Sequence, residues 1–159
     1  MRNPEMVKVE STHDHSSIQQ HFYKVEGTEA RDDALELLLL HHQPESAVVF
    51  CNTKKEVQNV NDELSHRGFS VIELHGDMEQ RERDQALVQF SNKTISILVA
   101  TDVAARGLDV DNLDAVFNFE LSRDPEVHVH RIGRTGRAGS KGVAISFFSE
   151  KEMHLSLIH

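Results

Sequence analysis

The sequence predicts one α/β domain of three layers, in which a mostly parallel sheet is flanked by helices on both faces. Three observations predict this fold class. The length of 159 residues suits a single core. Short β-branched apolar runs such as residues 47–51 are typical of strands buried on both sides. Segments with a helical apolar period separate these runs, and strands that alternate with helices form parallel sheets covered on both faces.

The first half of the chain contains two predicted strands and two predicted helices. An imperfect apolar alternation predicts a strand over 18–25, and apolar residues at helical spacing predict a helix over 30–38. After the buried strand 47–51, apolar positions at i, i+3 and i+7 predict a helix over 57–64, which Gly68 ends. We therefore expect the sheet and its helices to alternate from the start of the domain.

The second half continues the alternation. Apolar runs predict strands over residues 71–74, 95–100, 115–119 and 142–148. Helices are expected over 78–90 and 125–132, the second because Pro125 suits a first helical turn. Ser149, with Glu152 three residues on, forms the capping pattern of a last helix.

Residues 1–17 are polar, have no sustained period and contain Pro4, so we interpret them as a linker or arm and assign the domain to residues 18–159. No apolar run could span a bilayer or form a signal peptide, since even the run 47–51 has only five residues. We assign the leucine run 37–40 to the core. Cys51 is the only cysteine, so no internal disulfide can form. We expect a soluble cytoplasmic protein with no membrane contact.

The net charge of −9 would ordinarily argue against a nucleic-acid partner. Basic residues nevertheless gather in the stretch 127–142, which contains no Asp or Glu. A local basic strip can bind a phosphate chain even on an acidic domain. The eleven histidines form no arrangement that is specific for a metal, so we expect no metal site.

The strongest functional pattern is the stretch 130–139, with the sequence His-Arg-Ile-Gly-Arg-Thr-Gly-Arg-Ala-Gly. Its arginines Arg131, Arg134 and Arg137 are three residues apart, and the glycines between them favour the end of a helix. Guanidinium groups that project from a helix end suit phosphate oxygens. The alternative is a solvated basic turn, which we consider the weaker interpretation because no acid in the stretch pairs with the arginines.

The second pattern is the stretch 100–109, directly after a predicted strand. Ligands bind at the carboxyl ends of the strands in an open parallel sheet. Thr101 could donate a hydrogen bond to a phosphate, Gly107 lets the backbone approach a ligand, and Asp109 suits a sugar hydroxyl. Asp102 is either a ligand contact or a helix N-cap.

These two patterns, in this order and at this separation, resemble motifs V and VI of the DEAD-box RNA helicases. Residues 48–54 resemble motif IV, and His75-Gly76-Asp77 leads into Gln80-Arg81-Glu82-Arg83, which resembles the Q-x-x-R motif. The resemblance covers residues 18–148 and implies the second RecA-like domain of that family. Residues 50–55 and 124–130 are most similar to bacterial members that act on ribosomal RNA.

The resemblance implies roles for the matching residues. Arg134 and Arg137 would be the catalytic arginine fingers that reach the γ-phosphate of ATP. Gly107 and Asp109 would contact the ATP ribose. Two further residues would couple the two helicase domains, namely His130 and Arg131. Five residues would contact the RNA backbone, namely Thr53, Gly76, Gln80, Arg83 and Thr101. Arg83 could instead form a surface pair with Glu79.

The sequence contains no phosphate loop of the form G-x-x-x-x-G-K-[S/T] and no Asp-Glu-Ala-Asp tetrad. ATP and Mg²⁺ would therefore be held mainly by an N-terminal RecA-like domain, and this domain alone would not hydrolyse ATP. The expected partners are that domain and RNA, ribosomal RNA in particular, with a role in ribosomal RNA remodelling and ribosome assembly. The alternatives are a stand-alone RNA-binding or regulatory module without an ATPase partner, and half of a DNA translocase.

Overall fold

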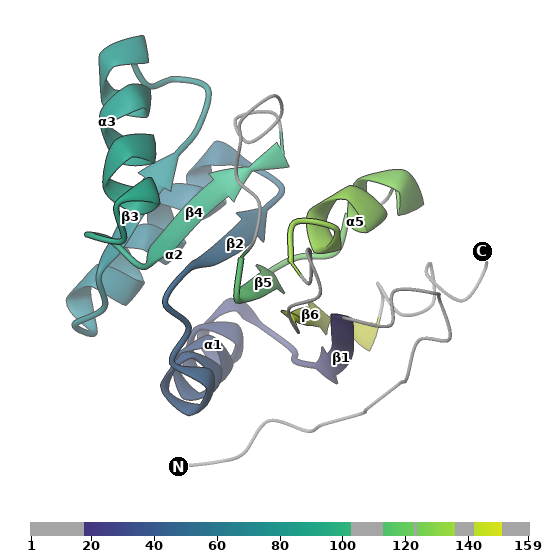
Figure 1. Ribbon diagram of the computed structural model, residues 1–159. Coiled ribbons are helices and arrows are strands. Elements are labelled where there is room, and N and C mark those ends of the chain that lie inside the picture. The colour runs from purple at the N-terminus through teal and green to yellow at the C-terminus, as the bar shows by residue number, and fades with distance from the viewer. Residues whose placement is uncertain (1–17, 103–112, 123, 136–141, 151–159) are drawn as a thin grey trace.

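The computed structural model describes residues 18–102, 113–122, 124–135 and 142–150. Its described strands form one six-stranded sheet in the order β1-β6-β5-β2-β4-β3, and all five pairings are parallel (Figure 1). The strands are β1 Ile18–Lys24, β2 Ala47–Cys51, β3 Val71–Leu74, β4 Ile97–Thr101, β5 Ala115–Asn118 and β6 Gly142–Phe148. The predicted parallel sheet is confirmed.

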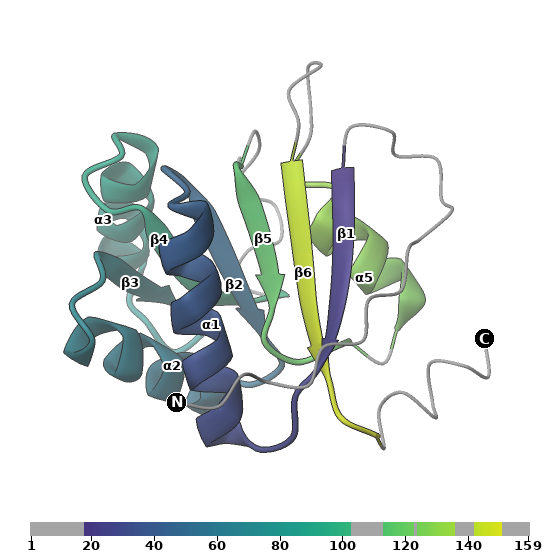
Figure 2. The ribbon, with the colours of Figure 1, turned by 90° about the horizontal axis from the view of Figure 1, so that it is seen from below.

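Four described helices cover the sheet on both faces. They are α1 Thr28–His42, α2 Lys54–His66, α3 Gln80–Ser91 and α5 Pro125–Ile132. Figure 2 shows α1 and α2 in front of the sheet, with α5 behind it, and α3 lies on the same side as α5. The predicted three-layer α/β architecture is therefore confirmed.

The core is divided by the sheet into two layers. Successive residues of β2 alternate between them: Val49 and Cys51 pack under α1 and α2, whereas Val48 and Phe50 pack on the side of α3. All five residues of β2 are buried, which is what its uninterrupted apolar run predicts. This central strand leads into the loop that begins at Asn52 and contains the candidate site residue Thr53.

Local capping explains why the helices begin where they do. The Thr53 hydroxyl oxygen accepts from the Glu56 backbone N–H at 3.2 Å and starts α2 three residues before the predicted position. Asp124 caps α5 in the same way, with 2.9 Å between its Oδ1 and the Glu126 nitrogen. At its far end, α2 is followed by Gly68, whose φ of 93° suits glycine.

The assignment of the whole leucine run to the core is wrong for Leu40, and Leu37 is only partly buried. Leu39 is buried and Leu38 packs against the core, but Leu40 is 54% exposed. Consecutive residues of a helix point in directions about 100° apart, so four in a row cannot all face the sheet. The predicted arm 1–17 and the predicted last helix lie outside the described residues. Among those described, every helix is too short or too polar to cross a lipid bilayer.

Candidate functional site

The carboxyl edge of the sheet is organised around Arg131, a residue of α5 that is only 1% exposed. Its Nε and Nη2 donate to the two carboxylate oxygens of Asp102, each at 2.7 Å. Nη2 also donates to Asn52 Oδ1 at 2.9 Å. Nη1 donates to Asn118 Oδ1 at 3.1 Å and to the Glu120 carbonyl at 2.8 Å. One guanidinium therefore bonds residues that follow β2 and β4 and residues at the end of β5.

This arrangement provides the buried positive charge of Arg131 with an opposite charge and with hydrogen-bond acceptors. The planar guanidinium faces Asp102 with a two-pronged hydrogen bond, and its carbon lies 5.2 Å from the centre of the Phe50 ring. A buried cation is tolerated only when it is paired and its donors are bonded. The structure gives Asp102 a role outside the two sequence interpretations: both of its carboxylate oxygens accept from Arg131.

The polar network continues into the sheet through two residues that the sequence analysis missed. Asn118, fully buried in β5, donates from Nδ2 to Ser146 Oγ of β6 at 2.9 Å. Its Oδ1 is the acceptor for Arg131, so both ends of the amide are used. The signal that could have found them is a single polar residue within an otherwise apolar, buried strand, because such a residue needs an internal partner.

The segment after α5 is fixed against the chain that leads into β5. The Leu113 backbone N–H donates to the Arg134 carbonyl at 3.0 Å, and the Thr135 hydroxyl donates to the Leu113 carbonyl. The two strongest sequence patterns, which are separated along the chain, meet in space through the pair of Asp102 and Arg131. Arg134 is half-buried at this junction. Gly107, Asp109 and Arg137 lie outside the described residues.

The two residues predicted to couple the helicase domains differ in exposure. His130 is exposed on α5, beside the exposed Val129. The hydrogen bonds of Arg131, in contrast, all go to acceptors of this same domain. The coupling role stays a prediction for both residues. Arg131 would have to couple the domains indirectly, through the residues that its guanidinium bonds.

The five candidate RNA contacts lie along one part of the same edge. Thr53 and Gly76 follow β2 and β3, and Thr101 ends β4, which lies between those two strands. Gly76 is exposed, with no atom within 4 Å of where a side chain would begin. Gln80 and Arg83 belong to the first turn of α3, and Gln80 donates to Asp84 at 2.9 Å. The structure brings the five together at the ends of neighbouring strands and at the start of α3.

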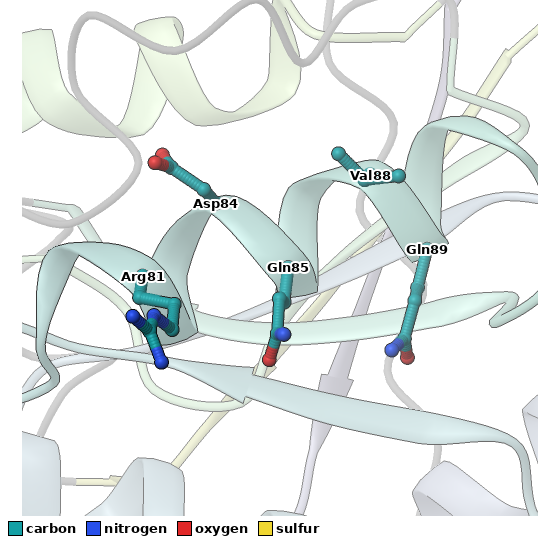
Figure 3. A pocket seen from close by; sticks show the side chains of 5 residues that line it. All are labelled: Arg81, Asp84, Gln85, Val88 and Gln89. Carbon is teal, nitrogen blue, oxygen red and sulfur yellow. The ribbon is translucent and has the colours of Figure 1, made fainter.

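The outer surface of α3 carries a shallow pocket beyond these residues. Figure 3 shows that Arg81, Gln85 and Gln89 extend to one side of the helix, while Asp84 and Val88 extend to the other. The sequence analysis assigned no role to this surface. Within the described ranges, no three His, Cys, Asp or Glu side chains gather closely enough to hold a metal ion.

Comparisons with known proteins agree on one kind of domain. The family description "Helicase conserved C-terminal domain" matches residues 29–139. The chain is 54% identical over 151 residues to the ATP-dependent RNA helicase DbpA of Escherichia coli, which covers 95% of this chain and 33% of DbpA. The chain thus spans about a third of the length of that curated relative.

Solved structures give the same result. A DEAD box protein from the hyperthermophile Methanococcus jannaschii superposes with a TM-score of 0.82 at 39% identity, over 91% of this chain and 39% of that one. Saccharomyces cerevisiae Dbp5, solved bound to RNA and ADP BeF3, superposes with a TM-score of 0.79 at 34% identity, over 89% of this chain and 38% of that one.

Proposed function

We propose that residues 18–159 form the second RecA-like half of a helicase, because this chain belongs to the DEAD-box ATP-dependent RNA helicases as their C-terminal helicase domain. In this proposal the domain closes on an N-terminal RecA-like domain around ATP and RNA. The observation that carries it is the Arg131 network, which ties the loop ends beside Thr53 and Thr101 to the helix that leads into Arg134.

The proposed contribution to ATP hydrolysis comes from the segment after α5. Arg134 and Arg137 would donate to the γ-phosphate as charge develops there, and such fingers are worth on the order of 10³-fold or more in rate. Gly107 and Asp109 would contact the ribose. Because the sequence lacks a phosphate loop, the N-terminal domain would hold most of the ATP and the Mg²⁺. The fixed junction between Leu113 and Arg134 supports this assignment, since it presets where the first finger begins.

The proposed RNA surface consists of Thr53, Gly76, Gln80, Arg83 and Thr101. Their hydroxyl, amide, guanidinium and backbone groups suit phosphate and sugar oxygens, and such contacts position a strand without reading its sequence. Dbp5, which has the same fold, was solved bound to RNA. We place the substrate among ribosomal RNAs, with a role in ribosome assembly, because residues 50–55 and 124–130 resemble bacterial helicases of that group.

The finger assignment is tested in the full protein that carries this chain. We expect Arg134→Ala and Arg137→Ala each to lower RNA-stimulated ATP turnover by about 10³-fold, with an unchanged circular dichroism spectrum. Arg81→Ala, which removes an exposed arginine of α3, is the matched control and should turn over ATP normally. Wild-type turnover in both finger variants would contradict the assignment of Arg134 and Arg137 as arginine fingers. No ATP turnover by the wild-type protein itself, with RNA binding intact, would favour a stand-alone RNA-binding module.

The substrate class is tested by the same turnover assay with different nucleic acids. We expect stimulation by RNA and little by DNA of the same sequence, because the proposed contacts include the sugar hydroxyl that DNA lacks. Equal stimulation would favour a DNA translocase. Ribosomal RNA should stimulate more strongly than unrelated RNA of equal length, and equal values would remove the ribosomal part of the proposal.

A further inference from the structure

A salt bridge between two exposed side chains spans the proposed RNA surface. Lys54 is the first residue of α2 and follows Thr53, and Asp77 follows Gly76 in the turn between β3 and α3. The Lys54 ammonium donates to the Asp77 carboxylate. Because β4 lies between β2 and β3, this pair bridges the loops on either side of the strand that ends at Thr101. The pair is thus surrounded by three of the five candidate RNA contacts.

The position of Asp77 is set from inside the domain by His75, which is buried. The Asp77 backbone N–H donates to His75 Nδ1 at 3.3 Å, which leaves the ring hydrogen on Nε2, 3.3 Å from Glu73 Oε2. The Met78 backbone N–H donates back to the His75 carbonyl at 3.3 Å. The turn that carries the carboxylate is therefore held by the end of β3, and the carboxylate meets Lys54 from a fixed backbone.

Stability does not explain this pair. Its side chains are 58% and 61% exposed, and exposed ion pairs contribute between zero and about 1 kcal/mol. A cation in the first turn of a helix is also disfavoured by the helix dipole, so Lys54 does not stabilise α2 by its position. A carboxylate among phosphate contacts would repel RNA unless a cation neutralises it, and Lys54 supplies that cation. The hydrogen bond from Lys54 lowers the pKa of Asp77.

An ammonium group has three donors, and Asp77 occupies one of them. We propose that Lys54 is a further contact to the RNA backbone and that Asp77 is the residue that positions its ammonium over the end of β4. The remaining N–H donors of Lys54 bind a phosphate oxygen between the Thr53 and Gly76 loops. This inference rests on the proposed function, since it adds a contact to the same RNA surface.

The test is equilibrium binding of a short fluorescein-labelled single-stranded RNA to the full protein, at several KCl concentrations and with a non-hydrolysable ATP analogue. We expect Lys54→Ala to weaken binding about fivefold and to lower the slope of log affinity against log salt by about 0.7, the value for one lost phosphate contact on a single strand. Lys55→Ala is the matched control, because Lys55 is an equally charged, exposed neighbour. It should keep the wild-type affinity and slope.

Asp77→Asn separates positioning from simple repulsion. If Asp77 positions Lys54, binding weakens about twofold while the salt slope keeps its wild-type value, because the phosphate contact persists with a less ordered ammonium. Tighter binding than wild type would overturn the positioning role. A Lys54→Ala variant that matches Lys55→Ala in both affinity and slope would overturn the contact itself.

Two further variants distinguish the failure of this inference from failure of the proposed function. Gln80→Ala and Arg83→Ala remove contacts that the proposed function requires and that this inference does not use. If they weaken RNA binding while Lys54→Ala does not, only the Lys54 contact is wrong. If all of them bind as the wild type does, the RNA surface itself is misplaced, and this inference is overturned with it.

Discussion

Arg131 and Arg67 each gather several acceptors, but in opposite surroundings. Arg131 is buried and bonds one carboxylate, two side-chain amides and one backbone carbonyl from the ends of three strands. Arg67, at the end of α2, has a side chain that is 18% exposed and bonds three carboxylates of α1 and α2, at 2.8 to 3.1 Å. The first arginine fixes the geometry of a site, whereas the second only balances charge on the helical face.

The number of salt bridges that an arginine forms therefore does not measure its contribution to stability. Water competes for the Arg67 partners, which are all partly exposed, so the pairs contribute little. Arg131 is only 1% exposed, so losing its geometry would leave the partly buried Asp102 carboxylate and the buried Asn118 amide oxygen without their donor. Four variants test this difference between the two arginines, and they follow in order of decreasing expected change in stability.

Arg131→Lys should lower the free energy of unfolding by about 3 kcal/mol, because an ammonium cannot face Asp102, Asn52 and Asn118 at once. Urea denaturation followed by circular dichroism measures the effect. A loss below about 1 kcal/mol would mean that the network contributes no more than a surface pair does, and the contrast would break.

Ser146→Ala should cost about 1 to 2 kcal/mol, since it leaves the buried Asn118 amide donor without its acceptor. The matched control is Ser70→Ala, whose hydroxyl makes an exposed hydrogen bond to the Thr94 carbonyl at 3.4 Å and should change stability by less than about 0.5 kcal/mol. Equal losses of stability in the two variants would show that burial of the network adds nothing to the free energy of unfolding.

Asp32→Asn tests a half-buried carboxyl group that interacts electrostatically with Glu63 and Arg67. Burial raises the pKa of the Asp32 carboxyl to about 6, and the Glu63 carboxylate adds to the rise. The folded chain therefore binds this proton more tightly than the unfolded chain, so Asp32 adds stability at acidic pH and loses that contribution as the pH rises through about 6.

The neutral amide should accordingly stabilise the domain by about 1 kcal/mol at alkaline pH, a value reduced by the solvent that reaches the half-buried group. Below the unfolded pKa of a carboxyl the gain should vanish, since Asp32 is then protonated in both states. Thermal denaturation of variant and wild type at both pH values measures this difference. A gain that is independent of pH would contradict the assignment to Asp32 ionisation.

Arg67→Lys should have the smallest effect, less than about 1 kcal/mol, because a lysine can still meet one of the exposed carboxylates. The remaining difference should fall further at high salt, which screens exposed charges. A loss as large as that of Arg131→Lys would remove the distinction between the two arginines.

The sequence was sufficient for the order of the elements and for the family. Apolar runs and periods, together with Pro125 for α5, identified all six described strands and four described helices, and the ordered motifs identified the helicase domain. The helix ends differed by several residues because caps such as Thr53 decide them through single hydrogen bonds. Leu40 was misassigned because a run of four leucines says nothing about which of them faces the sheet.

The site was less accessible to sequence reasoning. Arg131 stands among arginines that look alike in the sequence, yet it is buried where Arg134 is half-buried, and its partners are 11 to 79 residues away. Local spacing cannot reveal such partners, because they are brought together only by the order of the strands. The same holds for Lys54 and Asp77, which stand 23 residues apart and meet across the end of β4.

Cys51, the only cysteine of the chain, lies fully buried at the end of β2. Burial raises the pKa of its thiol well above the ordinary value, and the thiolate is the form that reacts with maleimides. A cysteine introduced at an exposed position, such as Lys55→Cys, would therefore be the one site of this domain that takes up a dye. Fluorescence energy transfer from a dye at this position could then test the proposed domain closure without removal of Cys51.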